Sequence, residues 1–226
     1  MVPARHAGRG GRGGDRLVLT ALFVPEHYRQ GDQRALVEAM RDNAFATIIS
    51  ADSGGAPSAT WIPFLIEGTP ERPVIFGHMA RANDQWRSWT AQTPLLALFQ
   101  GPHHYISPSW YEHPAPHVPT WNYVVVQVRG RPRLLGDPAE VEAMLDRLVE
   151  QFESARAAPW ELGAQPADYR ARQAAGIVAF ELMIEEITGA WKLSQRAGLA
   201  DRSGAIAGLR AQGGDQALAI AALMDG

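Results

Sequence analysis

Short runs of apolar and β-branched residues, some of them alternating with polar residues at a period of two, mark six segments of this 226-residue chain, and each segment predicts a β-strand. In chain order these segments are 45–50, 58–66, 73–77, 95–100, 121–130 with 132–135 as a continuation, and 176–187. The stretch 52–57 reads Asp-Ser-Gly-Gly-Ala-Pro, which is typical of a turn, so the first two strands form an antiparallel hairpin. Pro63 predicts an edge, a bulge or a bend within the second strand.

Helical spacing of hydrophobic residues marks the rest of the chain. Asp32 is a predicted N-cap for a helix that ends near Asn43, with Leu36, Val37 and Met40 on one side. Further helices are predicted at 83–89 (short, with two tryptophans), from Asp137-Pro138 to Phe152, at 167–175, at 201–212 and at 215–224.

The stretch 101–120 holds five prolines and four histidines and lacks either periodicity. We expect a long irregular segment there, with a little extended structure at Tyr105-Ile106. Antiparallel strands with few helices between them, followed by a helix pair and a last strand, indicate an α+β barrel. No strand is followed by GxGxxG, and no GxxxxGK[ST] occurs, which argues against those nucleotide-binding loops.

Composition narrows the class of protein. Hydrophobic residues make up 46% of the chain and charged residues 20%, as in ordinary globular proteins, and there is no cysteine for a disulfide or a thiolate nucleophile. No apolar run approaches the ~20 residues of a membrane span, so we expect no membrane partner and a cytoplasmic location. Residues 1–16 form an Arg/Gly-rich stretch that we expect to be a disordered tail. The net charge is −3 and the tail is basic, so the remaining chain is acidic and a poor generic DNA binder.

One candidate ligand site begins where the third strand ends, in the sequence Gly-His-Met-Ala-Arg-Ala-Asn-Asp-Gln-Trp of residues 77–86. Arg81 offers a bidentate fork to a phosphate, and Asn83 offers an amide beside the free N–H groups of a helix start. The alternative is structural, with Asn83 capping the helix and Arg81 solvated.

Two other segments supply candidate pocket residues. Flat side chains with polar tips, suited to lining a planar ring or packing in an interface, occur at Tyr105, Ser107, Trp110, Trp121, Asn122 and Tyr123. Directly after the last predicted strand, Lys192 and Gln195 could donate hydrogen bonds to a flavin; the alternative is an ordinary surface lysine and glutamine. We expect no metal site, because the four histidines of 101–120 lie in a proline-rich stretch without a pattern of carboxylates.

Seven motifs in order give the chain a family resemblance. They are 23–29 (FVPEHYR), 59–64 (ATWIPF), 77–83 (GHMARAN), 99–102 (FQGP), 105–111 (YISPSWY), 118–123 (VPTWNY) and 191–195 (WKLSQ). Together they resemble the PaiB-type family of FMN-binding negative transcriptional regulators. The chain differs from that pattern in having Trp61, Ala190 and Arg196 where we expect His, Lys and Asn.

The resemblance implies an antiparallel, Greek-key-like split β-barrel related to pyridoxamine-phosphate oxidases, and a homodimer with FMN at its interface. It implies a barrel domain at 17–195 with a helical insertion at about 138–175, and a C-terminal helical extension at 196–226. By position, the residues it implies for FMN are Thr60, His78, Arg81, Asn83, Gln85, Trp191, Lys192 and Gln195, with Arg81 as the principal phosphate ligand.

Three functions remain open at this point. The first is a dimeric FMN-binding repressor, which requires DNA as a partner. The second is an FMN-dependent oxidoreductase that acts on a small planar or haem-like substrate, with His78 and His104 as the nearest acid–base candidates. The third is a flavin-free dimeric binding protein.

Overall fold

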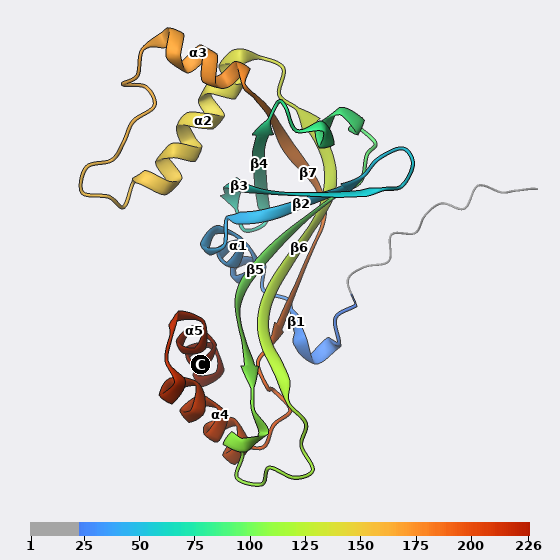
Figure 1. The fold of residues 1–226 in the computed structure, drawn as a ribbon, viewed down its shortest axis with the longest axis vertical. Helices are drawn as coiled ribbons and strands as arrows, with labels where there is room; N and C mark the ends of the chain where they lie inside the picture. The colour runs from blue at the N-terminus through green and yellow to red at the C-terminus, as the bar shows by residue number, and fades with distance from the viewer. Residues whose placement is uncertain (1–22) are drawn as a thin grey trace, which may run out of the picture.

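In the computed structural model, which describes residues 23–226, one antiparallel sheet of seven strands closes on itself (Figure 1). The strand order is β1-β7-β4-β3-β2-β5-β6, and an additional pairing between β7 (Ile177–Lys192) and β6 (Thr120–Leu134) closes the ring and leaves the short β1 outside it. The other strands are β1 (Arg29–Gln30), β2 (Phe45–Ala51), β3 (Pro57–Thr69), β4 (Arg72–Ala80) and β5 (Leu95–Ile106). The predicted α+β antiparallel barrel is confirmed.

Helices cover the outside of this sheet and its two ends. The α-helices are α1 (Gln33–Asp42), α2 (Pro138–Glu153), α3 (Ala167–Ala175), α4 (Leu199–Gln212) and α5 (Asp215–Asp225). Three short 3-10 helices are η1 (Glu26–Tyr28), η2 (Asp84–Ser88) and η3 (Pro108–Trp110). All of the predicted helices are present, and the short one after Asn83 is a 3-10 helix. The predicted tail at 1–16 and the predicted start of the barrel domain at 17 lie outside the described residues.

Side-chain caps explain where two helices begin. The Asp32 carboxylate accepts a hydrogen bond from the Arg34 amide at 2.9 Å, and the Asp137 carboxylate accepts one from the Ala139 amide at the same distance. Pro138 follows Asp137 at the first helical position, where a missing N–H costs nothing. Both starts were therefore readable from the sequence.

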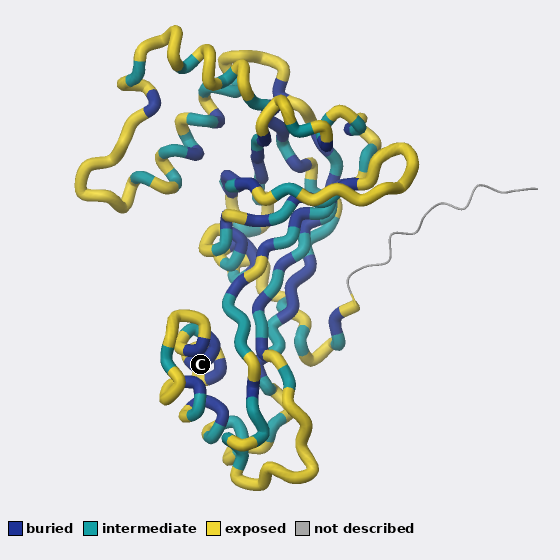
Figure 2. Tube along the Cα trace, viewed as in Figure 1, coloured by how far each residue is buried: buried dark blue, intermediate teal, exposed yellow. Residues whose placement is uncertain are grey.

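Buried residues form three clusters, and Figure 2 shows buried residues along the strands and in the C-terminal helices. The largest fills the barrel, where Phe64, Phe99 and Phe180 meet the apolar side of α1. A second cluster lies under α2 and contains Met144 and Leu148. The third lies between the C-terminal helices and the far ends of the long strands. No helix of residues 23–226 is long and apolar enough to cross a membrane.

Pro63 lies at a change of partner within β3. Residues 57–63 of this strand pair with β2, and residues 64–69 pair with β4. The Phe64 amide donates to the Ala44 carbonyl at 2.8 Å, on the β2 side of the strand. Because neighbouring backbone nitrogens point to opposite sides, the nitrogen of Pro63 points to the β4 side, and pairing with β4 begins only at Phe64. The proline therefore removes no ladder hydrogen bond.

Two predicted boundaries were wrong. The first six residues of the supposed irregular segment belong to β5, which continues through a bulge between Gln100 and His103 to Ile106. Pro102 lies in that bulge, and residues 103–106 pair only with β6, so the proline is tolerated. Strand β7 likewise continues to Lys192, so Trp191 and Lys192 lie within the last strand and not after it.

The ends of β5, β6 and β7 form an arm that leaves the barrel, and α4 and α5 pack on it (Figure 1). Trp110, in η3 at the tip of β5, holds α4 in place. A Cβ atom on Gly204 would collide with the Trp110 carbonyl oxygen, and one on Gly208 would collide with its indole ring. The two glycines let the helix approach this close.

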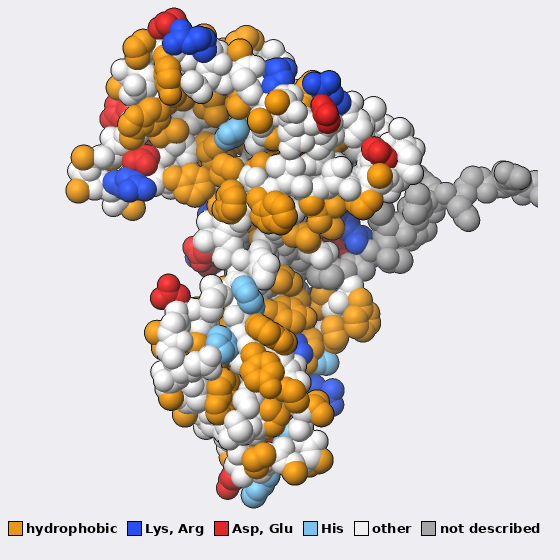
Figure 3. Space-filling view, in the orientation of Figure 1, with side chains coloured by type: hydrophobic (Ala, Val, Ile, Leu, Met, Phe, Trp, Pro, Cys, Tyr) orange, Lys and Arg blue, Asp and Glu red, His pale blue; other side chains and the backbone are white. Residues whose placement is uncertain are grey.

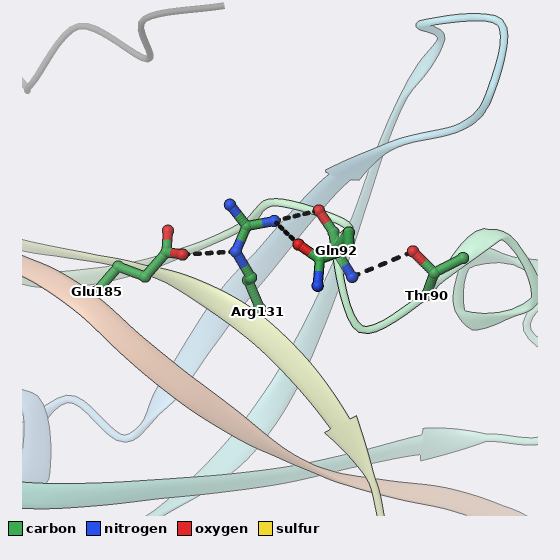
Figure 4. Close-up of polar contacts among 4 residues, drawn as sticks. All are labelled: Thr90, Gln92, Arg131 and Glu185. Atoms are coloured by element: carbon green, nitrogen blue, oxygen red, sulfur yellow. Dashed lines mark hydrogen bonds and ion pairs between the residues drawn. The ribbon is translucent and has the colours of Figure 1, made fainter. Parts of the chain in front are cut away.

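A second bulge lets β6 cross from the arm into the barrel. The β6–β7 register shifts between Arg129 and Gly130, and a Cβ atom on Gly130 would collide with the Met183 carbonyl oxygen. Beside the bulge, the Arg131 guanidinium contacts Glu185 at 2.5 Å and donates to the backbone carbonyl of Gln92 (Figure 4). Arg131 thus ties the turn before β5 to the bulge, because it binds both sides of the junction.

We expect the Gly130→Ala substitution to lower the free energy of unfolding by about 1–3 kcal/mol, because the methyl group has no space against the β7 backbone. Gly136→Ala is the control, since nothing lies within 4 Å of a Cβ there. Urea titration of both variants measures the difference. Equal stabilities would show that the bulge adapts to a side chain.

Candidate functional site

The predicted site residues separate into two groups in the structure. The strand-end cluster lies at one end of the barrel and consists of Thr60, His78, Arg81, Asn83 and Gln85. The arm cluster lies on the arm and consists of Tyr105, Trp121, Tyr123 and Lys192. The remaining candidates, Ser107, Trp110, Asn122, Trp191 and Gln195, lie near the arm cluster.

Three members of the strand-end cluster bind one another. The Thr60 hydroxyl donates to the Gln85 carbonyl oxygen at 2.6 Å and accepts from the Asn83 amide at 2.9 Å. The Asn83 side chain also caps η2, because its oxygen accepts from the Gln85 backbone N–H at 2.9 Å. The predicted cap by Asn83 is therefore confirmed, and it positions the start of η2.

The amide of Gln85 is buried and fully engaged. Its nitrogen lies 3.1 Å from the Ser50 hydroxyl and within 3.3 Å of the Ile48 and Ser58 carbonyl oxygens. Trp89 donates to the same Ser50 hydroxyl at 3.0 Å. This polar network ties η2 to β2 and β3 at one mouth of the barrel.

Arg81 joins β4 to the beginning of β7. Its Nε donates to the Ala175 carbonyl at 2.8 Å, and its Nη2 donates to the Ile177 carbonyl at 2.6 Å. Trp86 lies beside the guanidinium, 6.0 Å from ring centroid to Cζ. The Nη1 atom of Arg81 has no hydrogen-bond partner among residues 23–226, so this exposed nitrogen remains available to an anion.

His78 is enclosed beside this junction. Burial lowers the pKa of its imidazole, so the ring is neutral at pH 7. The Nδ1 atom is buried and has no partner within the described part of the chain. A neutral imidazole adds no positive charge for a phosphate here.

The arm cluster shares one face of the sheet. Tyr105 of β5 is paired with Trp121 of β6, and Tyr123 of β6 is paired with Lys192 of β7. Trp121 and Tyr123 are two residues apart on β6, so their side chains lie on the same face. The Tyr105 and Trp121 rings meet edge to face, with centroids 6.1 Å apart. The register therefore places three aromatic rings and an ammonium group on one surface.

Lys192 has no carboxylate partner in the described residues. Its Nζ donates to the Thr120 hydroxyl at 2.6 Å and lies 5.9 Å from the centre of the Tyr28 ring. Asp201 and Arg196 line the same pocket without forming an ion pair with Lys192, so its ammonium group is suited to binding an anionic or electron-rich ligand. Tyr28 and Thr120 were not foreseen from the sequence, because they are far from Lys192 along the chain.

Other candidates on the arm serve its own structure. The Asn122 side chain is completely buried, and its amide nitrogen contacts the Ser194 hydroxyl at 3.0 Å and the Met224 sulfur at 3.2 Å. Ser107 caps η3 by accepting from the Ser109 amide. Gln195 binds the backbone of Leu193 and Trp191 within its own turn. Trp191 lies on the opposite face from Lys192, packed between the barrel and the C-terminal helices.

The two clusters lie at opposite ends of β7. The Arg81 amide donates to the carbonyl of Gly176, immediately before the strand, and Lys192 is the last residue of the strand. Sixteen residues of extended chain span roughly 50 Å along the strand path, and Figure 1 shows β7 running from the α3 end of the molecule into the arm. One chain therefore cannot bring both clusters to a single small cofactor.

An apolar surface lies between the clusters. A continuous row of residues crosses four strands on the outside of the barrel: Trp61 on β3, Thr47 on β2, Leu98 on β5 and Gln127 on β6. The exposed fractions of Trp61 and of Phe45, two residues from Thr47 on the same face, are 64% and 69%. We call Phe45, Trp61, Leu96, Leu98, Trp121 and Val125 the outer apolar face. Figure 3 shows hydrophobic side chains gathered on the surface over the arm.

The family described as "Putative FMN-binding domain" matches residues 22–186. The chain belongs to this family. It is 31% identical over 204 residues to "Protease synthase and sporulation protein PAI 2" of Bacillus subtilis, an alignment that covers 90% of this chain and 97% of that protein. The predicted PaiB-type resemblance is confirmed.

Solved structures confirm the predicted split barrel. The FAD and haem binding protein of Mycobacterium smegmatis superposes with a TM-score of 0.57 at 16% identity and covers 73% of both chains. The flavocytochrome Anf3 of Azotobacter vinelandii superposes with a TM-score of 0.57 at 18% identity, over 74% of this chain and 72% of that one. At these identities the likeness concerns the fold.

FMN is the cofactor of this split-barrel chain, and the donors present fit it. Arg81, at the strand-end cluster, would supply positive charge for its phosphate. The arm cluster would supply flat apolar surfaces for its planar ring and a cation for the electron-rich edge of that ring. When bound, FMN supplies hydride or one-electron transfer, and the chain's own residues bind and orient it.

We expect Gln85→Leu to lower the free energy of unfolding by about 2–4 kcal/mol, because the Thr60 and Ser50 hydroxyls and nearby carbonyls lose a buried partner. Gln173→Leu is the control, on the exposed side of α3. Thermal and urea denaturation measure both variants. If the two were equally stable, the network would not hold the barrel mouth closed.

Proposed function

We propose that this chain is an FMN-binding homodimer in which each FMN contacts both copies. The strand-end cluster of one copy binds the phosphate, and the arm cluster of the other binds the ring. The observation that carries this proposal is the separation of Arg81 from Lys192 along β7. Two copies related by a two-fold axis, with their long strands antiparallel, bring unlike ends together.

The outer apolar face is the surface by which the copies associate. This face lies between the two clusters. When two copies bury it against each other, the strand-end cluster of one copy approaches the arm cluster of the other. Exposed Phe45 and Trp61 and the half-buried Leu98, with Thr47 between Trp61 and Leu98, give it an apolar centre of a kind that monomeric soluble proteins seldom expose. Trp61, which stands where the family pattern has His, adds to this interface.

Arg81 is the proposed phosphate ligand through its Nη1. Its other donors bind the Ala175 and Ile177 carbonyls, which fixes the guanidinium in place before FMN arrives. Such a fixed group loses little conformational entropy on binding. At the other end, Lys192 favours the reduced flavin, because its positive charge stabilises negative charge on the ring.

The role of this site is redox chemistry or redox sensing, and we assign no DNA contact to α4 and α5. Arg210 pairs with Asp225 at 2.6 Å, and Arg202 binds the Met224 carbonyl, so both arginines serve the helix pair itself. A regulatory output, as in the family resemblance, then passes through the flavin or a protein partner. Retention of a specific DNA sequence at physiological salt would contradict this assignment.

Purified protein is expected to take up FMN and to release it on denaturation, with flavin absorbance as the measure. Arg81→Ala should raise the dissociation constant for FMN about 10- to 100-fold, because a charge-assisted contact to the phosphate is lost. Fluorescence quenching of FMN during titration gives the constants for both proteins.

Arg87→Ala is the matched control for this measurement. Arg87 follows in the same turn and is exposed; it pairs with Asp84 at 3.1 Å and, like Arg81, lies 6.0 Å from the centre of the Trp86 ring. Its loss should leave FMN affinity unchanged. Equal affinities of the Arg81 variant and the wild type would remove the phosphate assignment, and protein that takes up no FMN would remove the proposed function.

A further inference from the structure

A cavity lies at the far end of the arm, where β6 begins and β7 ends (Figure 1). We call it the arm cavity. It has a volume of about 290 Å³, and the turn after β7 and the start of α4 form much of its wall. Most of its lining side chains have a polar end, and they include Tyr111, Lys192 and Arg196. The arm cavity therefore suits a small polar ligand.

Arg196 is an accessible cation in this wall. The residue is exposed, and its guanidinium forms no hydrogen bond or ion pair within residues 23–226. The family pattern has Asn at this position, so the charge is a property of this chain. All of the N–H donors of Arg196 are therefore available to an oxyanion.

Lys192 and Tyr111 add donors that a ligand can reach. The Lys192 ammonium uses one of its three protons, in the bond to the Thr120 hydroxyl at 2.6 Å. Tyr111 is half-buried, and its hydroxyl has no hydrogen-bond partner in the described part of the chain. Burial and the nearby Asp201 carboxylate raise the pKa of this hydroxyl, so it keeps its proton at neutral pH.

Asp201 supplies the carboxylate of the cavity wall, and each of its oxygens has a neighbour. Its Oδ1 accepts from the Glu112 amide at 3.2 Å, and its Oδ2 lies 3.6 Å from His117 Nε2. Arg196 and Lys192 bring two positive charges against this one negative charge, so the wall has a net charge of plus one before any proton on His117. One monoanion balances that charge.

The turn that carries Arg196 has an uncommon backbone conformation. Ser194 has a φ of 58°, in the left-handed region where residues other than glycine are rare. Its hydroxyl donates to the side-chain oxygen of Asn122 at 3.1 Å, and Asn122 is completely buried. This bond anchors the turn, so a fixed backbone presents Arg196 and Ala197 to the cavity.

We propose that the arm cavity binds a small hydroxylated monocarboxylate. The carboxylate accepts hydrogen bonds from Arg196 and from the Tyr111 hydroxyl, and a hydroxyl of the ligand accepts from Lys192. A neutral polyol would leave the positive charge unbalanced, and an apolar acid would leave donors of the wall without acceptors. The second charge of a phosphate dianion would face Asp201 without a matching cation.

The place of this acid beside the flavin rests on the proposed function. Lys192 belongs both to the arm cluster and to the wall of the arm cavity, so an acid in the cavity lies next to the ring that Lys192 contacts. The oxidised ring is uncharged, and the positive charge of Lys192 then remains for the acid. The arm cavity thereby selects small hydroxy acids as the molecules that are brought to FMN.

Isothermal titration calorimetry of the full chain, without FMN and loaded with FMN, tests this proposal with glycerate and gluconate. Glycerol and sorbitol are the uncharged counterparts, butanoate is the apolar acid and inorganic phosphate is the dianion. We expect saturable binding of at least one hydroxy acid and binding of the other compounds that is weaker by about tenfold. Phosphate that bound more tightly than both hydroxy acids would overturn the proposal.

Two variants test the donors in the same titrations. Arg196→Asn should weaken binding of the hydroxy acid by about tenfold, because a charge-assisted contact is lost. Tyr111→Phe removes only the hydroxyl and keeps the ring that packs against His117, so it should weaken binding by roughly threefold. Arg34→Asn is the control, because Arg34 is exposed on α1 and lies outside the cavity wall. Its titration should match that of the wild type.

Absence of binding for both hydroxy acids, or wild-type affinity in Arg196→Asn, would overturn the acid site while leaving the FMN proposal standing. Protein that takes up no FMN would remove the proposed function, and titration of the FMN-free protein would still decide the acid site. In the FMN-loaded protein, the bound acid should shift the visible absorbance of the flavin. An unchanged spectrum at saturating acid would overturn the placement of the acid beside the ring.

Discussion

The uninterrupted strand β7 is the constraint on which the arrangement of this molecule depends. It closes the barrel by pairing with β4 through its first half and with β6 along most of its length, and its end pairs with β1. The register places Ile177 opposite Ala80 at one end and Lys192 opposite Tyr123 at the other. Neither cluster can move toward the other without breaking this ladder, so the distance between them is a property of the fold.

The hydrogen bonds divide the candidate residues into those that hold the fold together and those that keep donors for a ligand. Gln85 and Asn122 are buried and engaged with their own chain, so they hold the barrel mouth and the C-terminal helices in place. Lys192 and Arg81 keep donor capacity and are positioned by neutral groups, a hydroxyl in one case and backbone carbonyls in the other. Positive charge that no acidic side chain neutralises is what an anionic cofactor requires.

The sequence predicted the features that depend on neighbouring residues, namely the helix starts and the positions of the strands. The cap at Asp32 and the Asp137-Pro138 start each marked a helix correctly, and apolar, β-branched runs marked every long strand of the barrel. Strand ends were missed where pairing with a neighbouring strand determines them. Strand β5 continues past Pro102 because the proline lies in a bulge and the residues after it pair with β6 alone. The motifs identified the family, but contacts between distant segments, such as Arg81 with the end of α3, required the structure. Alternation of Phe45 with Thr47 and Ile49 was a missed signal of the outer apolar face.

The most direct test of the shared site is subunit complementation. Arg81→Ala and Lys192→Ala chains, each with a different affinity tag, are mixed and the dimer carrying both tags is isolated. If each FMN contacts both copies, this dimer has one site with both residues intact and one with neither. It should then bind one FMN at wild-type affinity, although each variant alone binds weakly. A mixed dimer that binds no FMN at wild-type affinity would contradict the account.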